Sequence, residues 1–125
     1  MTKLKLLIDT DPGVDDALAI LMAHAHADVL GLSIAAGNVG LAHTVRNALK
    51  LVEVIGADTP VFAGCATPLV LPAEDAAFVH GADGFGDTGH HWIRRNLQVR
   101  ARVSYRCLQR LRDQPCLVAV RPEGP

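Results

Sequence analysis

Short apolar runs alternate with longer amphipathic segments along the first half of the chain. A short continuous apolar run is typical of a strand buried on both faces, whereas apolar residues spaced three and four apart predict a helix. The pattern predicts three strands, over residues 3–9, 29–36 and 60–63, and two helices, over residues 15–25 and 42–55. This alternating order predicts an α/β fold with a doubly wound, Rossmann-like and mostly parallel sheet whose crossovers are right-handed.

The regular pattern ends at Gly64, where a long segment rich in glycine and proline begins. Loops this long inside a compact domain are usually functional or disordered, and this one, residues 64–91, contains His80. After it, residues 103–112 are compatible with a helix and residues 116–120 with a fourth strand. The pattern therefore predicts one α/β domain or part of one, without an internal repeat or an interdomain linker.

Four acidic residues within eight positions, Asp9, Asp11, Asp15 and Asp16, follow the first predicted strand and surround a Pro-Gly turn. So many like charges destabilise a fold unless a cation, protons or hydrogen-bond donors compensate them. Asn38 follows the second predicted strand. Because ligands in such folds bind beyond the carboxyl ends of the strands, we expect these five side chains to converge on one crevice.

Oxygen ligands that include several carboxylates select a hard cation, Ca²⁺ or Mg²⁺, over zinc or copper, and Ca²⁺ suits the larger oxygen sets. Such a cation lowers the pKa of a bound water, and a neighbouring carboxylate can take its proton. Capping of a helix N-terminus would explain Asp15 and Asp16 but not all four acids. The acidic cluster therefore predicts a metal site, a catalytic site or both.

Four motifs stand in order within residues 3–92. They read D-T-D-P-G-V-D-D-A at 9–17, A-A-G-N-V at 35–39, P-V-F-A-G at 60–64 and V-H-G-A-D-G-F-G at 79–86. In order and in spacing they resemble the N-terminal part of the inosine-uridine preferring nucleoside hydrolases. The resemblance implies a truncated nucleoside hydrolase fold. It also implies hydrolysis of the N-glycosidic bond of a ribonucleoside to base and ribose, with a tightly held Ca²⁺.

Carried over residue by residue, the resemblance implies roles for five side chains. Asp11 and Asp16 would be calcium ligands, and Asp11 would also be the base that deprotonates the attacking water. Asp15 and Asn38 would hold ribose hydroxyls, and His80 would lie at the mouth of the pocket. Carboxylates near the sugar would stabilise the oxocarbenium-like transition state of glycosidic cleavage.

Two other functions stay open from the residues alone. A strand followed by D-x-D also begins the active site of haloacid-dehalogenase-like phosphatases, in which Asp9 would be the nucleophile. Gly13 stands where that family normally has Thr or Val, and the second pair of acids follows too soon. The third interpretation is a non-catalytic module that binds a metal or a partner through the same loop. If the protein is not such a phosphatase, Asp9 is expected to support the end of the first strand.

The net charge of −1 conceals two different parts of the chain. Residues 1–93 hold four basic and eleven acidic side chains, a net charge of −7, and are expected to form the N-terminal part of the nucleoside-hydrolase-like domain. Residues 94–125 hold eight arginines, no lysine and two acids, a net charge of +6, and are expected to form a divergent segment of the same incomplete domain. A shifted reading frame in a GC-rich gene would give such a composition. Without an aromatic platform beside the arginines, we expect no nucleic-acid partner.

No apolar stretch reaches the roughly 18–20 residues that span a bilayer, and no secretory signal opens the chain, so we expect a cytoplasmic protein without membrane contact. Three cysteines without C-x-x-C spacing predict neither a disulfide framework nor a zinc site. The resemblance implies further calcium and ribose ligands that these 125 residues lack. We therefore predict little or no hydrolysis by the chain alone, and exposed apolar faces that favour homo-oligomers or aggregation.

Overall fold

The computed structural model describes residues 3–68, 70, 72–89 and 116–119. The predicted strands and helices among these residues are present, with ends that differ from the sequence prediction by one or two residues. A short helix inside residues 64–91 was not predicted. The elements are β1 (Lys5–Thr10), α1 (Val14–His26), β2 (Asp28–Ile34), α2 (Leu41–Ile55), β3 (Val61–Ala63), α3 (Ala77–His80) and β4 (Cys116–Ala119).

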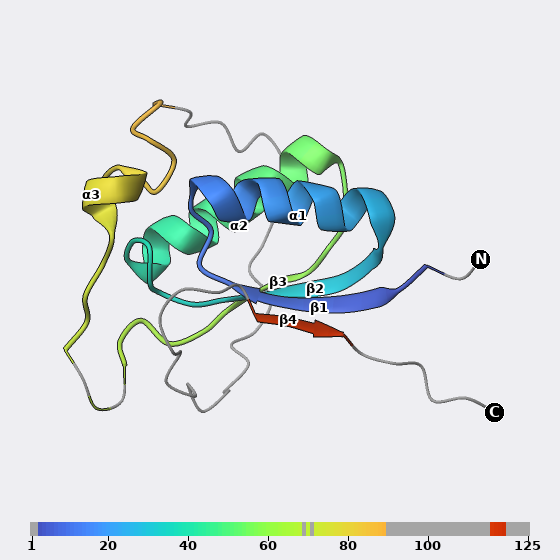
Figure 1. The fold of residues 1–125 in the computed structure, drawn as a ribbon, viewed down its shortest axis with the longest axis horizontal. Coiled ribbons are helices and arrows are strands. Elements are labelled where there is room, and N and C mark those ends of the chain that lie inside the picture. Colours follow the sequence, from blue (N-terminus) through green and yellow to red (C-terminus); the bar gives the residue numbers. More distant parts are fainter. Residues whose placement is uncertain (1–2, 69, 71, 90–115, 120–125) are drawn as a thin grey trace.

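The strands form one sheet in the order β3-β2-β1-β4 (Figure 1). β1 pairs in parallel with β2, and β2 pairs in parallel with β3. β4 pairs antiparallel with β1, from Leu6 opposite Ala119 to Asp9 opposite Cys116. A short apolar strand can satisfy the backbone groups along the edge of β1 in either direction, so its sequence does not fix its orientation.

Both long helices, α1 and α2, lie on one face of the sheet (Figure 1). This placement follows from the topology, because the chain forms β1, β2 and β3 in one direction across the sheet. Two right-handed crossovers in the same direction put their helices on the same side. A doubly wound sheet carries helices on both faces, so the described residues form one half of that arrangement.

The hydrophobic core lies between the sheet and these two helices. Alternate residues of β1, Leu6 and Ile8, and of β2, Leu32 and Ile34, are buried in it, and α1 contributes Ile20. Burying one such side chain contributes about 1.5–3 kcal/mol of hydrophobic stabilisation. A slip of one residue would turn every one of these side chains to the other face, so the core also fixes the strand register. The register in turn fixes where each loop leaves the sheet.

The buried side of α2 is not wholly apolar. Leu51 and Val52 lie in the core, whereas Thr44 and Asn47, at helical spacing from them, are 0% and 1% exposed. Buried polar side chains in native proteins nearly always have hydrogen-bond partners. The helix ends at Gly56, whose φ of 74° is the left-handed conformation that closes many helices.

The outward side of α1 carries an apolar stripe at helical spacing, exposed by 38% to 64% and made of Val14, Leu18, Leu21 and Met22. The exposed apolar surface predicted from the sequence belongs to the faces of an incomplete sheet, whereas this stripe lies on a helix. None of the helices in the described part of the chain is long and apolar enough to cross a membrane.

Some predictions concern residues outside the described part of the chain. The helix predicted over residues 103–112 and all eight arginines of residues 94–125 lie there, so the structure does not bear on either. Among the described residues, Cys65 is an exposed free thiol.

Candidate active site

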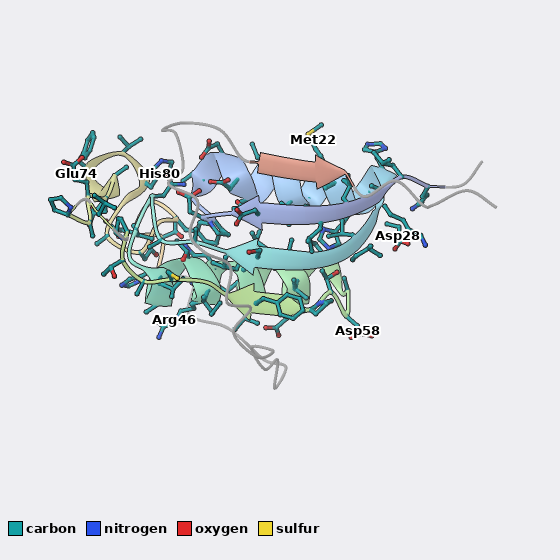
Figure 2. All side chains as sticks on the ribbon, turned by 90° about the horizontal axis from the view of Figure 1, so that it is seen from below. Met22, Asp28, Arg46, Asp58, Glu74 and His80 are labelled. Carbon is teal, nitrogen blue, oxygen red and sulfur yellow. The ribbon has the colours of Figure 1, made fainter. Side chains whose placement is uncertain are left out.

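The carboxyl ends of β1 and β2 bring the predicted site residues together. Figure 2 shows His80 at the end of the sheet to which the arrowheads of β1, β2 and β3 point, with Asp28 and Asp58 at the opposite end. The loop that leaves β1 carries Asp11, and the first turn of α1 carries Asp16. The predicted convergence beyond the carboxyl ends of the strands is therefore present for Asp11, Asp16 and Asn38, whereas Asp9 stands within β1.

Asp16 is buried, with 5% of its surface exposed, and accepts three hydrogen bonds. The hydroxyl of Thr10 donates to Oδ1 at 2.7 Å. The backbone N–H of Gly13 and the side-chain amide of Asn38 donate to Oδ2 at 3.2 and 2.8 Å. A buried carboxylate needs such donors or a cation, and its position at the N-terminus of α1 adds a favourable interaction with the helix dipole.

Asn38 joins the two buried acids. Its backbone N–H donates to Oδ2 of Asp11 at 2.9 Å, and its side-chain Nδ2 donates to the backbone oxygen of Asp11 at 2.9 Å and to Asp16. Asp11 is 8% exposed. Both amide hydrogens of Asn38 are thus used, while no hydrogen bond to its Oδ1 is found within the described ranges. Asn38 holds the carboxylates in place and keeps one acceptor available.

Two glycines allow this close packing. A Cβ at Gly37 would overlap Oδ2 of Asp11, and a Cβ at Gly13 would lie 2.7 Å from Nδ2 of Asn38. Real Cβ contacts are essentially never that short. Glycine at both positions therefore lets the loops after β1 and β2 approach each other.

His80, at the end of α3, lies next to the acidic loop, residues 11–13, which joins β1 to α1. Its ring is 14% exposed, and the backbone N–H of Val14 donates a long hydrogen bond of 3.4 Å to Nδ1. Nδ1 also lies 3.9 Å from Oδ1 of Asp15, whose side chain is 78% exposed, so the two form an ion pair only when His80 is protonated. Asp15 and His80 thus lie at the rim of the site, above the buried Asp11 and Asp16.

The loop that follows His80 is held by its own hydrogen bonds. Oδ1 of Asp83 accepts the backbone N–H groups of Phe85 at 2.7 Å and Asp87 at 3.0 Å. Burial raises the pKa of Asp83. These two N–H groups and the positive charges of Lys50 and His43 lower it by more than burial raises it, so the pKa lies below its ordinary value of 3.8. The ionised carboxylate therefore stabilises this loop.

The carboxylate oxygens of the site are of the type that a hard cation prefers as ligands, but there are too few of them for a complete coordination sphere. Asp11 and Asp16 offer carboxylate oxygens, and each oxygen has two lone-pair positions, so the hydrogen bonds to Asp16 leave capacity for a cation. Calcium takes about six to eight oxygen ligands. Within the described part of the chain, no three His, Cys, Asp or Glu side chains gather closely enough to hold a metal. The described residues could therefore supply only part of a coordination sphere.

Sequence reasoning missed several residues that organise the site. Thr10 stands between two acids and was not predicted as a site residue, although it donates the shortest of the three hydrogen bonds to Asp16. The close approach that requires glycine at positions 13 and 37 was not predicted. Asn47 gave no usable signal, because it stands two residues from both Val45 and Leu49 and therefore on the side of the predicted helix opposite to them. Asp9 lies within β1 and pairs with Ser33, in keeping with its expected place at the end of the strand.

Solved structures that resemble this fold are nucleoside hydrolases. The plant nucleoside hydrolase PpNRh1 is 41% identical, with a TM-score of 0.69, over 79% of this chain and 33% of the other. The purine-preferring ribonucleoside hydrolase from Gardnerella vaginalis is 36% identical, with a TM-score of 0.62, over 66% of this chain and 28% of the other.

The chain belongs to the inosine-uridine preferring nucleoside hydrolase family, whose sequence model matches residues 6–122. The non-specific ribonucleoside hydrolase RihC of Salmonella agona is 40% identical over 104 residues, which are 82% of this chain and 33% of the relative. RihC of Klebsiella pneumoniae is 38% identical over 109 residues, 86% of this chain and 35% of the relative. The chain thus spans about a third of the length of these relatives.

Proposed function

We propose that this chain carries one side of the active site of a calcium-dependent ribonucleoside hydrolase, with a nucleoside as its small-molecule partner. The observation that supports this most directly is the bridge by Asn38, which holds the buried carboxylates of Asp11 and Asp16 at the carboxyl end of the sheet. Family membership favours glycosidic hydrolysis over the phosphatase alternative, in which Asp9 would be the nucleophile.

Asp11 and Asp16 would hold the cation. Both are buried carboxylates, and hard oxygen ligands of this kind suit Ca²⁺. When bound, calcium would lower the pKa of a water.

The protein's own groups would perform the remaining tasks. The carboxylate of Asp11, fixed by the backbone N–H of Asn38, would accept a proton from the attacking water. Oδ1 of Asn38 and the exposed carboxylate of Asp15 would accept hydrogen bonds from ribose hydroxyls. The buried negative charge of Asp16 would favour the oxocarbenium-like transition state. His80 would close the mouth of the site.

Calcium titration followed by calorimetry tests this assignment. Asp16→Asn should weaken calcium binding by more than about tenfold, because it removes a charged ligand rather than an outer support. Asp28→Asn, an exposed carboxylate at the opposite end of β2, is the matched control and should bind calcium as the unsubstituted chain does. Equal affinity in all three proteins would remove Asp16 from the proposal.

The effect of ribose on calcium affinity distinguishes an active-site fragment from a non-catalytic metal-binding module. If Asn38 and Asp15 hold ribose next to the cation, added ribose should raise the apparent calcium affinity. Calcium binding that ignores ribose would favour the module. Hydrolysis of inosine or uridine by the 125-residue chain alone should be slight, because it spans only about a third of its relatives' length; hydrolysis at rates typical of whole enzymes would contradict this.

A further inference from the structure

We propose that Asn47 is a positioning residue that fixes the loop carrying Asp11 and the loop following His80 relative to each other. The proposal rests on the function proposed above, because it assigns a task within the same site. Within the described part of the chain, the hydrogen bonds of Asn47 go to backbone oxygens and not to the carboxylates or the imidazole, so its effect would be transmitted through backbone groups.

The geometry of Asn47 suits this task. It projects from the buried side of α2 with 1% of its surface exposed. Its Nδ2 donates to the backbone oxygen of Pro12 at 3.2 Å and to that of Asp83 at 2.9 Å. Pro12 directly follows Asp11 and Asp83 lies shortly after His80, so one amide group holds both loops.

The second loop behaves as one unit, so a bond at Asp83 restrains all of it. The backbone N–H of Gly86 donates to the oxygen of His80 at 2.7 Å. The side chain of Asp83 accepts hydrogen bonds from the backbone N–H groups of Phe85 and Asp87, and the N–H of Asp83 in turn donates to Oδ1 of Asp87 at 3.1 Å. Holding the oxygen of Asp83 therefore also restrains the backbone of His80.

Close packing leaves little freedom at this contact. Gly84 has a φ of +81°, and a Cβ there would lie 2.9 Å from Nδ2 of Asn47. One turn further along α2, Lys50 is 9% exposed and places its ammonium 5.8 Å from the centre of the Phe85 ring. α2 thus contacts the loop after His80 through Asn47 and Lys50. Of these two residues, Asn47 also holds the loop that carries Asp11.

The relative position of the two loops determines whether the ring of His80 can accept a hydrogen bond from the N–H of Val14, the first residue of α1. The 3.4 Å hydrogen bond from the N–H of Val14 to Nδ1 leaves the neutral ring with its hydrogen on Nε2. If Asn47 sets this position, its removal should release the ring from Val14 and give a mixture of the two tautomers. A residue that only stabilises the fold would not select a tautomer.

Ring ¹⁵N spectra at about pH 8, above the ordinary titration range of histidine, measure the tautomer directly. The His80 signal is identified by its loss in His80→Gln. We expect a single Nε2–H tautomer in the unsubstituted chain and a mixture in Asn47→Ala. Asn47→Leu, which removes the same donors but fills the space, should behave alike and serves if the alanine variant does not fold.

Thr44→Val is the matched control. Thr44 is a buried polar residue of the same helix, and its hydroxyl donates to the oxygens of Ala35 and Leu41 without joining the two loops. This variant should lose stability in urea unfolding yet keep the tautomer of the unsubstituted chain. An unchanged His80 signal in both Asn47 variants, or the same change in Thr44→Val, would overturn the proposal.

Calcium titration adds a second readout. Loss of an outer support typically weakens metal binding, and we expect about a tenfold loss in the Asn47 variants with little loss in Thr44→Val. Unchanged calcium affinity in the Asn47 variants would count against the role. If the unsubstituted chain binds no calcium, the proposed function fails, and the tautomer measurement still decides the role of Asn47.

Discussion

Gly13 and His80 approach so closely that a Cβ on Gly13 would lie 2.6 Å from Nδ1 of His80. The two residues come from distant parts of the sequence, the turn before α1 and the end of α3. The φ of Gly13 is −109°, which other residues adopt readily. Glycine is therefore required here for space rather than for backbone conformation, and the contact brings the rim of the site together.

Gly13→Ala is expected to destabilise the chain by about 1–3 kcal/mol, because the added methyl group must displace packed side chains. The free energy of unfolding in urea measures the loss. Gly40→Ala is the control, since no atom lies within 4 Å of a Cβ built there and the φ of Gly40 is −58°. Similar losses in the two variants would show that the contact with His80 is not the cause.

Thr10→Val should cost about 1–3 kcal/mol of stability, because Asp16 would lose a buried, charge-assisted hydrogen bond while the volume of the side chain is kept. Thr10→Ser keeps the hydroxyl and should recover most of the loss. Both are measured by chemical unfolding. If serine and valine behave alike, the hydroxyl does not support Asp16.

Stability should depend on the ionisation of Asp83. Its pKa is lower in the folded chain than its ordinary value of 3.8, so the carboxylate contributes stability above that pH and loses it as the pH falls through the folded pKa. Urea unfolding at a series of acidic pH values should show a shallower decline for Asp83→Asn. Asp28→Asn, far from the loop, should keep the slope of the unsubstituted chain.

The apolar stripe on α1 is expected to promote self-association, because contiguous exposed apolar surface favours contact between molecules. Leu18→Glu, in the middle of the stripe, should lower the concentration dependence of the sedimentation coefficient. Val54→Glu adds the same charge at a residue of α2 that is 78% exposed and outside the stripe. An equal effect of both substitutions would point to net charge rather than to the stripe.

The sequence was sufficient for the alternating elements and for the meeting of Asp11, Asp16 and Asn38, whereas only the family resemblance placed His80 at the mouth of the pocket. Local periodicity and the geometry of parallel sheets determine both. It did not reveal the direction of β4, since a short apolar strand pairs either way. It also missed the double contact of Asn47, because two backbone oxygens 35 and 36 residues away leave no trace in local composition.

Asn38 was expected as a ribose ligand, and the structure adds a second task. Its amide hydrogens already serve Asp11 and Asp16, so only the amide oxygen is left for a ligand. This restriction depends on the three-dimensional neighbours of the amide. No pattern in the sequence around Gly37 and Asn38 distinguishes it from an ordinary turn.

The contacts that hold the site have a consequence for the order of folding. Asn38 meets Asp16 across 22 residues, Asn47 meets Asp83 across 36, and Val14 meets His80 across 66. Contacts that close longer loops form later on average, because their entropic cost must be offset by structure already present. We expect the pair of carboxylates to assemble with the β1–α1–β2 unit, and His80 to join it only near the end of folding.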